Sequence, residues 1–201
     1  MPLINGNFAD GLRGWSVWER RGHPRVNIAQ DDMLGQQVIQ FESHNQTFEA
    51  GLLQGVSGGP LARFTLSAWV RFLLSDPTQN PDLTAIRAWV GIDPAGGTHP
   101  DSSGIVAVSA DVGRLVYERV TVTAESVRGD VTVFAGVEAG VNDQWRIANL
   151  IANISSVELD ITPGNVIPPM PPPASAPEFG IVGVQEFPDA FHVTMRWPKV
   201  K

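Results

Sequence analysis

The chain of 201 residues contains no cysteine. Disulfide bonds and thiolate metal sites are therefore excluded, and stability must come from packing and hydrogen bonds. Long apolar runs are also missing, since no window approaches the roughly 18 consecutive apolar residues of a membrane-spanning helix. The first eight residues, MPLINGNF, lack a basic region followed by an apolar core. We therefore expect neither membrane insertion nor an export signal within this chain.

Positive charge is scarce, with 14 lysine and arginine residues against 21 aspartate and glutamate residues and a net charge of −7. A protein that binds the phosphate backbone needs a basic stripe, so we expect no nucleic-acid partner. With 43% hydrophobic residues, a chain of this length can bury one sizeable core and carry a short appendage.

Helical periodicity is nearly absent, and short alternating runs of apolar and polar residues take its place. Clusters of Gly, Pro, Asn and Asp separate these runs at the spacing typical of all-β folds. The pattern predicts two antiparallel sheets packed as a β-sandwich. The expected strands are residues 15–19, 37–42, 51–56, 63–73, 85–92, 105–108, 115–123, 130–138 and 147–160.

The composition changes after residue 162. Residues 163–177 contain seven prolines, which predicts an extended Pro-rich linker between a domain over residues 1–162 and a tail over residues 178–201. Two short alternating runs, 179–187 and 190–197, predict a C-terminal β-hairpin in the tail. Because an isolated hairpin is marginal in water, we expect it to dock on a partner as an assembly tail. The apolar residues expected to dock are Phe179, Phe187, Phe191 and Trp197.

Two of the alternating runs carry a tryptophan on the side opposite their aliphatic residues. In the first run this side holds Trp69 and Arg71. In the second it holds Arg87 and Trp89. If the two strands are antiparallel neighbours, the four side chains lie on one surface, which suits a neutral glycan because indoles stack on sugar rings and arginines hydrogen-bond hydroxyls. The alternative is that this side faces a core or a neighbouring chain, since sandwiches bury large aromatic residues.

The other tryptophans have different expected positions. Trp15 is expected in the core, whereas Trp18 lies one step out of phase and is a candidate to reach the surface and contact the ligand. Trp145 follows a predicted loop and is the candidate aromatic residue at the edge of the site. The basic segment 20–25 offers contacts to an acidic sugar, but a short basic loop is more often simply solvated.

Catalytic patterns are absent from the sequence. The acidic residues are spread over turns and strand ends, whereas a glycosidase holds two carboxylates across one bond. The four histidines lie in separate segments, and no Gly-x-Ser-x-Gly elbow is present. We therefore expect a protein that is not an enzyme.

Several motifs resemble, in order and spacing, those of one class of proteins. They are NGNF at 5–8, GLRGW at 11–15, GLLQGVSG at 51–58 and FTLSAWV at 64–70. Over residues 3–160 the chain resembles carbohydrate-binding modules of the galactose-binding-like jelly-roll class. The resemblance implies a jelly-roll sandwich and non-catalytic glycan binding.

The same resemblance bears on metal binding. Such modules commonly hold a structural calcium ion with one acidic residue just after the NGNF-like motif and another in a late strand. Here Ala9 follows the motif, and the late segment 154–157 reads ISSV. Calcium prefers six to eight oxygen ligands with carboxylates among them, so we predict no bound metal and no other cofactor. A register shift that brings in Asp10 and Asp160 stays open.

Two functions follow from these observations. The first is a glycan-binding or adhesion module displayed on a larger assembly, such as a virion or cell surface, and anchored through its C-terminal arm. The alternative is a purely structural subunit of a phage capsid, phage tail or filament that binds no sugar. Both imply an oligomeric or assembly-bound protein at a particle or cell surface.

Overall fold

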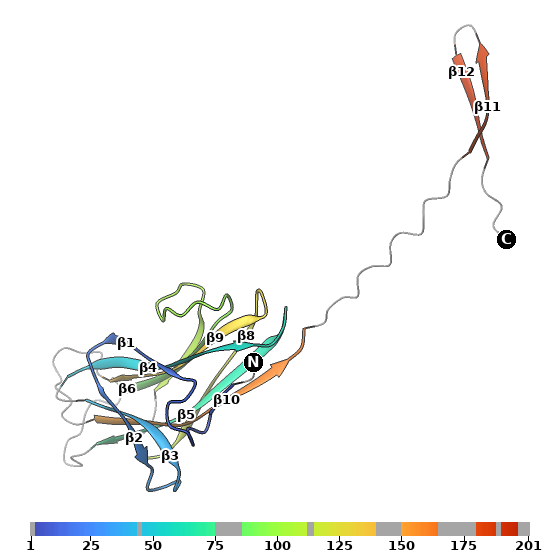
Figure 1. The fold of residues 1–201 in the computed structure, drawn as a ribbon. Coiled ribbons are helices and arrows are strands. Elements are labelled where there is room, and N and C mark those ends of the chain that lie inside the picture. The colour runs from blue at the N-terminus through green and yellow to red at the C-terminus, as the bar shows by residue number, and fades with distance from the viewer. Residues whose placement is uncertain are drawn as a thin grey trace. The chain divides into compact units, whose positions relative to one another are not determined.

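The computed structural model describes residues 3–43, 46–74, 86–111, 115–139, 150–164, 180–187 and 190–196. The chain divides into two compact units, Met1–Asn165 and Val166–Lys201. The first unit contains strands β1 to β10 and the second contains β11 and β12 (Figure 1). Among the described residues there is no helix that could cross a membrane.

The first unit is a sandwich of two antiparallel five-stranded sheets, which confirms the predicted fold class (Figure 1). The first sheet runs in the order β1 (Ser16–Arg21), β4 (Phe48–Ser57), β9 (Asp130–Ala139), β6 (Ile86–Asp93) and β7 (Val106–Asp111). The second sheet runs in the order β2 (Arg25–Gln30), β3 (Gln37–Glu42), β10 (Leu150–Thr162), β5 (Arg63–Leu74) and β8 (Glu118–Glu125).

The hydrophobic core lies between the two sheets and takes alternate residues from each strand. From β5 it takes Phe64, Leu66, Ala68, Val70 and Phe72, and from β6 it takes Ile86, Ala88, Val90 and Ile92. These are the apolar faces that the sequence predicted. Each fully buried side chain of Leu or Phe size contributes about 1.5–3 kcal/mol, so burial of this face fixes the register of both strands. Trp15 also lies in the core as predicted, packed against Phe8 with 5.8 Å between ring centroids.

The two tryptophan-bearing strands are not neighbours, so the condition for a single surface of Trp69, Arg71, Arg87 and Trp89 is not met. β5 belongs to the second sheet and β6 to the first, and their apolar faces meet across the core. Trp69 and Arg71 therefore lie on the outer side of one sheet, and Arg87 and Trp89 on the outer side of the other. Because side chains alternate between the two faces of a strand, the sequence shows which of them share a face. It does not show which sheet the strand joins.

One strand was not predicted. β2 (Arg25–Gln30) begins at the last residue of the basic segment 20–25 and forms an edge of the second sheet. All six of its residues are partly or fully exposed, and its apolar alternation is short and lies among polar residues. An exposed edge strand gives a weak sequence signal because it has little surface to bury.

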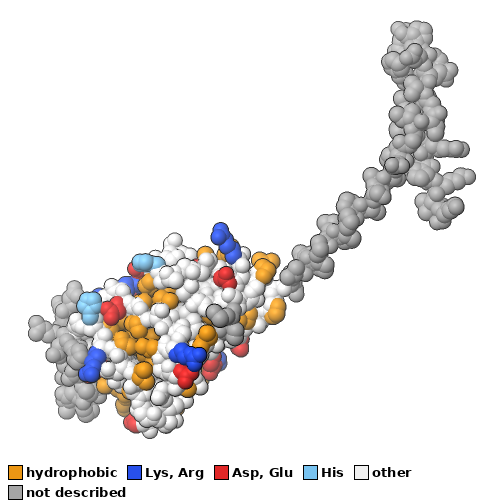
Figure 2. Space-filling model, in the orientation of Figure 1, with side chains coloured by type: hydrophobic (Ala, Val, Ile, Leu, Met, Phe, Trp, Pro, Cys, Tyr) orange, Lys and Arg blue, Asp and Glu red, His pale blue; other side chains and the backbone are white. Residues whose placement is uncertain are grey.

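The surface of the first unit mixes residue types. Some large apolar side chains are exposed, among them Met33, Leu61 and Val127. In the space-filling view, hydrophobic side chains lie between basic and acidic ones (Figure 2). Single exposed apolar residues are common on soluble proteins and do not by themselves mark a binding site.

The second unit contains the predicted C-terminal hairpin. β11 (Gly180–Phe187) pairs with β12 (Ala190–Arg196) in antiparallel register, with an irregularity between Ile181 and Gly183. Phe187 and Phe191 belong to these strands. The predicted docking residues Phe179 and Trp197, and residues 165–177 of the predicted linker, lie outside the described residues.

Candidate functional site

Two tryptophans flank two glycines across the outer side of the first sheet. Trp18 is paired with Gly51, Gly51 with Gly136, and Gly136 with Trp89, so the four residues form one row across β1, β4, β9 and β6. A Cβ atom on Gly136 would lie 2.5 Å from Trp89 Nε1, and one on Gly51 would lie 2.7 Å from the Trp18 ring. The glycines therefore leave the space in which the two indoles lie.

The two indoles contact each other and are largely covered. Their ring centroids are 5.1 Å apart, and Phe134 packs against Trp89 to complete a small cluster that is separate from the main core. Trp18 is 6% exposed and Trp89 is 8% exposed, so the prediction that Trp18 reaches the surface is wrong. Trp18 Nε1 donates to Leu52 O at 3.2 Å, whereas the buried Trp89 Nε1 has no hydrogen-bond partner.

A row of charged residues runs parallel to the aromatic row. The paired residues across the sheet are Arg21, Glu49, Glu138, Arg87 and Asp111. Arg21 contacts Glu138 at 3.0 Å, and Arg87 contacts Asp111 at 3.1 Å. Arg87 and Trp89 thus share one side of β6 as the sequence predicted, but Arg87 is already ion-paired.

Glu49 and Glu138 are direct neighbours on β4 and β9. Burial is the main reason that the pKa of Glu49 lies above its usual value. Arg20 acts in the opposite direction, and the nearby negative charge of Glu138 raises the pKa of Glu49 further. Both carboxylates project from the outer side of one sheet, where they can accept hydrogen bonds from a ligand.

Arg20 covers the two indoles. It lies at an irregularity of β1, where the pairing with β4 shifts between Glu19 and Arg21. Its guanidinium carbon is 5.8 Å from the Trp18 ring centre and 5.6 Å from that of Trp89, within the range of a cation–π contact.

The guanidinium of Arg20 is also held by acidic and backbone groups. It forms ion pairs with Glu49 and Asp101, and Nη2 donates to Pro100 O at 2.5 Å. Arg20 therefore links β1 to the segment that precedes β7. Its position differs from the solvated basic loop that the sequence predicted.

A pocket of about 460 Å³ opens beside these residues. Its lining consists of Arg20, Glu49, Trp89, Pro100, Asp101, Ser102, Ile105, Ala107, Val108, Ser109 and Glu138. The lining combines one aromatic and several aliphatic surfaces with carboxylates, a guanidinium and hydroxyl groups. Pockets that bind small polar ligands have this mixture, because the apolar surface supplies contact area and the polar groups fix orientation.

The outer side of the second sheet carries the other predicted residues. Trp69 is half-buried there, and the guanidinium carbon of Arg119 lies 6.0 Å from its ring centre. Arg119 also pairs with Glu158 at 3.0 Å, and the hydroxyls of Ser67 and Thr121 lie 2.9 Å apart. Trp69 is thus surrounded by polar groups that bond to one another, and it does not line the pocket described above.

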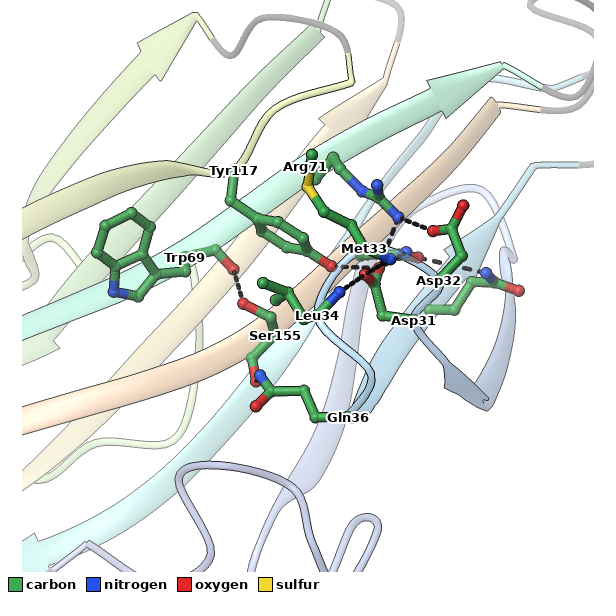
Figure 3. A network of polar contacts seen from close by, with 11 residues as sticks. Asp31, Asp32, Met33, Leu34, Gln36, Trp69, Arg71, Tyr117 and Ser155 are labelled. Atoms are coloured by element: carbon green, nitrogen blue, oxygen red, sulfur yellow. Dashed lines mark hydrogen bonds and ion pairs between the residues drawn. The ribbon is translucent and has the colours of Figure 1, made fainter.

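Arg71 belongs to a buried polar network on the same sheet (Figure 3). Its side chain is 4% exposed, and Nη2 contacts Asp31 at 2.6 Å and Asp32 at 2.8 Å. Tyr117 donates its hydroxyl to Asp31 at 2.6 Å, and Asn153 donates to the same carboxylate oxygen at 3.2 Å. As Figure 3 shows, Arg71 and Tyr117 both point toward Asp31, so Arg71 holds the turn between β2 and β3 on the sheet and is not free to bind a ligand.

The network changes the acidity of its members. Burial by itself would raise the pKa of Asp31, but hydrogen bonds from Tyr117, Leu34 and Met33 together with the charge of Arg71 outweigh it and leave this pKa below its usual value. Burial and the hydrogen bond to Asp31 raise the pKa of Tyr117 well above its usual range. Asp31 is therefore held as a carboxylate and Tyr117 as a neutral hydroxyl donor.

The structure separates the predicted ligand contacts into two groups. Trp18, Trp89 and Arg87 lie on the first sheet, whereas Trp69 and Arg71 lie on the second. Trp145, the predicted aromatic residue at the edge of the site, lies outside the described residues.

The sequence did not single out Glu49, Asp101 or Glu138, and it offered Arg20 only as part of the basic segment 20–25. Gly136, inside the predicted strand 130–138, was the available signal, because a glycine in a strand interior often marks a close approach of another group. Nothing in the sequence indicates that Glu49 and Glu138 are neighbours, since they lie far apart along the chain.

The residues at the expected calcium position do not fit that ion. Ala9 offers no side-chain oxygen, and Ile154 belongs to the core. The Asn5 amide instead closes this loop, donating to Gly11 O at 2.8 Å and accepting from Asp10 N at 3.0 Å. In the part of the chain that the structure describes, no three acidic or histidine side chains are grouped so that they could hold a metal ion.

Comparisons with known proteins identify the fold of the first unit. No protein-family model and no curated protein matches the chain. TmCBM61 in complex with β-1,4-galactotriose matches with a TM-score of 0.52 and 17% identity, covering 80% of this chain and 97% of that chain. The enzymatically active domain of bacteriophage CBA120 tailspike protein 4 matches with a TM-score of 0.54 and 13% identity, covering 80% of this chain but only 21% of that chain. The first unit thus has the β-sandwich fold of carbohydrate-binding modules, as the sequence motifs predicted.

Proposed function

We propose that the first unit is a non-catalytic glycan-binding module and that the pocket beside Trp89 and Arg20 is its binding site. The observation that carries the proposal is the combination, in one pocket of about 460 Å³, of an aromatic residue with three carboxylates and a guanidinium. The fold shared with carbohydrate-binding modules supports it but does not assign the ligand.

The pocket chemistry matches that of a sugar. A pyranose ring has apolar C–H faces and a rim of hydroxyls, so it needs apolar contact below and hydrogen-bond partners around it. Trp89 and Ile105 provide apolar contact, and Glu49 and Glu138 accept hydrogen bonds from hydroxyls.

The second unit has a role of its own in the proposed function. We infer that the second unit, with its hairpin β11–β12, anchors the module to a larger assembly at a virion or cell surface. The division of the chain into two compact units supports this inference. A short hairpin gains stability by packing on another protein, which gives it a reason to dock.

The site is tested by binding measurements on matched variants. Glu138→Gln changes a pocket carboxylate, whereas Glu158→Gln makes the same change on the opposite sheet. Full-length protein and both variants are screened on a glycan array, and hits are measured by calorimetry. We expect Glu138→Gln to lose roughly tenfold in affinity, because it removes a charged acceptor, and Glu158→Gln to bind like the parent. Equal binding by all three proteins, or no binding to any glycan, contradicts the proposed site.

A further inference from the structure

The pocket has an excess of negative charge. Among the described residues that line it, Glu49, Asp101 and Glu138 are acidic, and Arg20 is the only cation. Arg21 adds a second cation from the side through its ion pair with Glu138 at 3.0 Å. Arg87 lies opposite Glu138 on β6 and is ion-paired with Asp111, so three guanidinium groups stand against four carboxylates in and beside the pocket.

The excess negative charge lies at the two carboxylates that share Arg20. Arg20 is shared between Glu49 and Asp101, so one positive charge serves two carboxylates. His99 Nδ1 lies 3.8 Å from Asp101 and adds positive charge only when it is protonated. Burial is the main cause of the raised pKa of Glu49, and the negative charge of Glu138 raises it further, whereas Arg20 and Arg21 lower it. A further cation is stabilised here, and a further anion is destabilised.

The pocket also shows that its aromatic surface accepts a cation. The Arg20 guanidinium lies within 6 Å of both the Trp18 and Trp89 ring centres. Aromatic faces beside carboxylates are a recurrent way of binding ammonium groups, because the ring faces carry partial negative charge. Arg20 already occupies this aromatic face, so a ligand cation would bind at the carboxylates beside it.

We propose that the glycan bound in this pocket is an amino sugar, recognised through its protonated primary amine. The inference rests on the proposed glycan binding and names the ligand class of that same site. The ammonium group pairs with Asp101 and Glu138 and supplies the missing positive charge, while the sugar ring lies against Trp89 and Ile105. A uronic acid brings a fourth carboxylate into the pocket and is rejected.

The experiment compares chemical forms of the same sugar. Full-length protein is titrated with oligosaccharides of glucosamine and of galactosamine, with their N-acetylated forms, and with the corresponding neutral and uronic acid oligosaccharides. We expect the free amines to bind roughly tenfold tighter than the N-acetylated forms and the uronic acids to bind most weakly. Asp101→Asn removes one carboxylate whose side chain is 53% exposed, so folding is retained, and it should abolish most of this preference.

The controls separate the inference from the proposed function. Glu158→Gln, on the second sheet, should keep the preference for the amine. Equal affinity for the amine and N-acetylated forms, or a preference for uronic acids, overturns the inference while glycan binding stands. Competition by methylammonium alone, with no dependence on the sugar, also overturns it, because the pocket then recognises an amine without a glycan. If no oligosaccharide binds, both the inference and the proposed function fail.

Discussion

Trp89 and Gly136 are direct neighbours on β6 and β9, and the indole of Trp89 lies where Gly136 has no side chain. Because Gly136 has no side chain, the aromatic cluster can lie close to the sheet. With a Cβ atom at position 136 the indole would have to rise from the sheet toward Arg20, which lies 5.6 Å from the ring centre. The position of Trp89 in the pocket wall thus depends on Gly136, which contributes no side chain to the pocket.

Gly136→Ala should destabilise the first unit. The new Cβ would lie 2.5 Å from Trp89 Nε1 and 2.8 Å from the Trp18 ring, so both indoles must move. Overpacking of this kind costs about 1–3 kcal/mol of the free energy of unfolding, which urea denaturation measures. Gly55→Ala is the control on the same sheet, because a Cβ there meets no atom within 4 Å. Equal stability of the two variants would show that the indoles are loosely held.

Acid should weaken the network around Asp31. Because its folded-state pKa lies below the unfolded value of about 3.9, the carboxylate stabilises the fold above that pH, and this stability is lost as the pH falls through the folded-state pKa. Tyr117→Phe removes a hydrogen bond to Asp31, so it should raise the pKa of Asp31 and move the loss of stability to higher pH. At neutral pH the same variant should lose about 1–3 kcal/mol.

The acid prediction is measured by urea unfolding midpoints at a series of pH values. Thr123→Val serves as the control, because it removes a hydroxyl from a hydrogen-bonded pair with Thr65 on the same sheet, outside the network. If Tyr117→Phe and Thr123→Val follow the same pH dependence as the parent protein, Tyr117 has no influence on the acidity of Asp31.

Trp69→Ala should leave glycan binding unchanged. Trp69 lies on the second sheet, whereas the pocket lies on the first. Trp89→Phe, in contrast, should weaken binding roughly two- to tenfold, because it reduces the aromatic surface of the pocket. Calorimetry with the best glycan measures both. A loss of binding in Trp69→Ala with a stable fold would place the site on the second sheet.

Removal of the second unit should abolish assembly and leave glycan binding intact. A variant that ends at Asn165 keeps all strands of the first unit. We expect the full-length chain to form large species and the truncated chain to be a monomer, because the hairpin gains stability by docking. Light scattering measures both masses, and glycan binding should persist in the truncated chain. Monomeric behaviour of the full-length chain at high concentration would contradict the assembly role of the tail.

Local patterns predicted the elements and the orientation of their side chains. The alternation in residues 63–73 and 85–92 identified which side of each strand is apolar, because every second side chain points to the same face. The tail hairpin was equally visible, since its turn residues separate two alternating runs. These features depend on residues that are close together in the chain.

The sequence by itself determined an all-β chain, the apolar face of each main strand and the core position of Trp15. The tertiary structure alone decided that β5 and β6 join different sheets, that Trp18 meets Trp89 over two glycines, and that Arg71 is occupied by Asp31. It also brought Glu49 and Glu138 together. The physical reason is that alternation records burial along one strand, whereas the partners of a strand are chosen by packing between segments far apart in the chain.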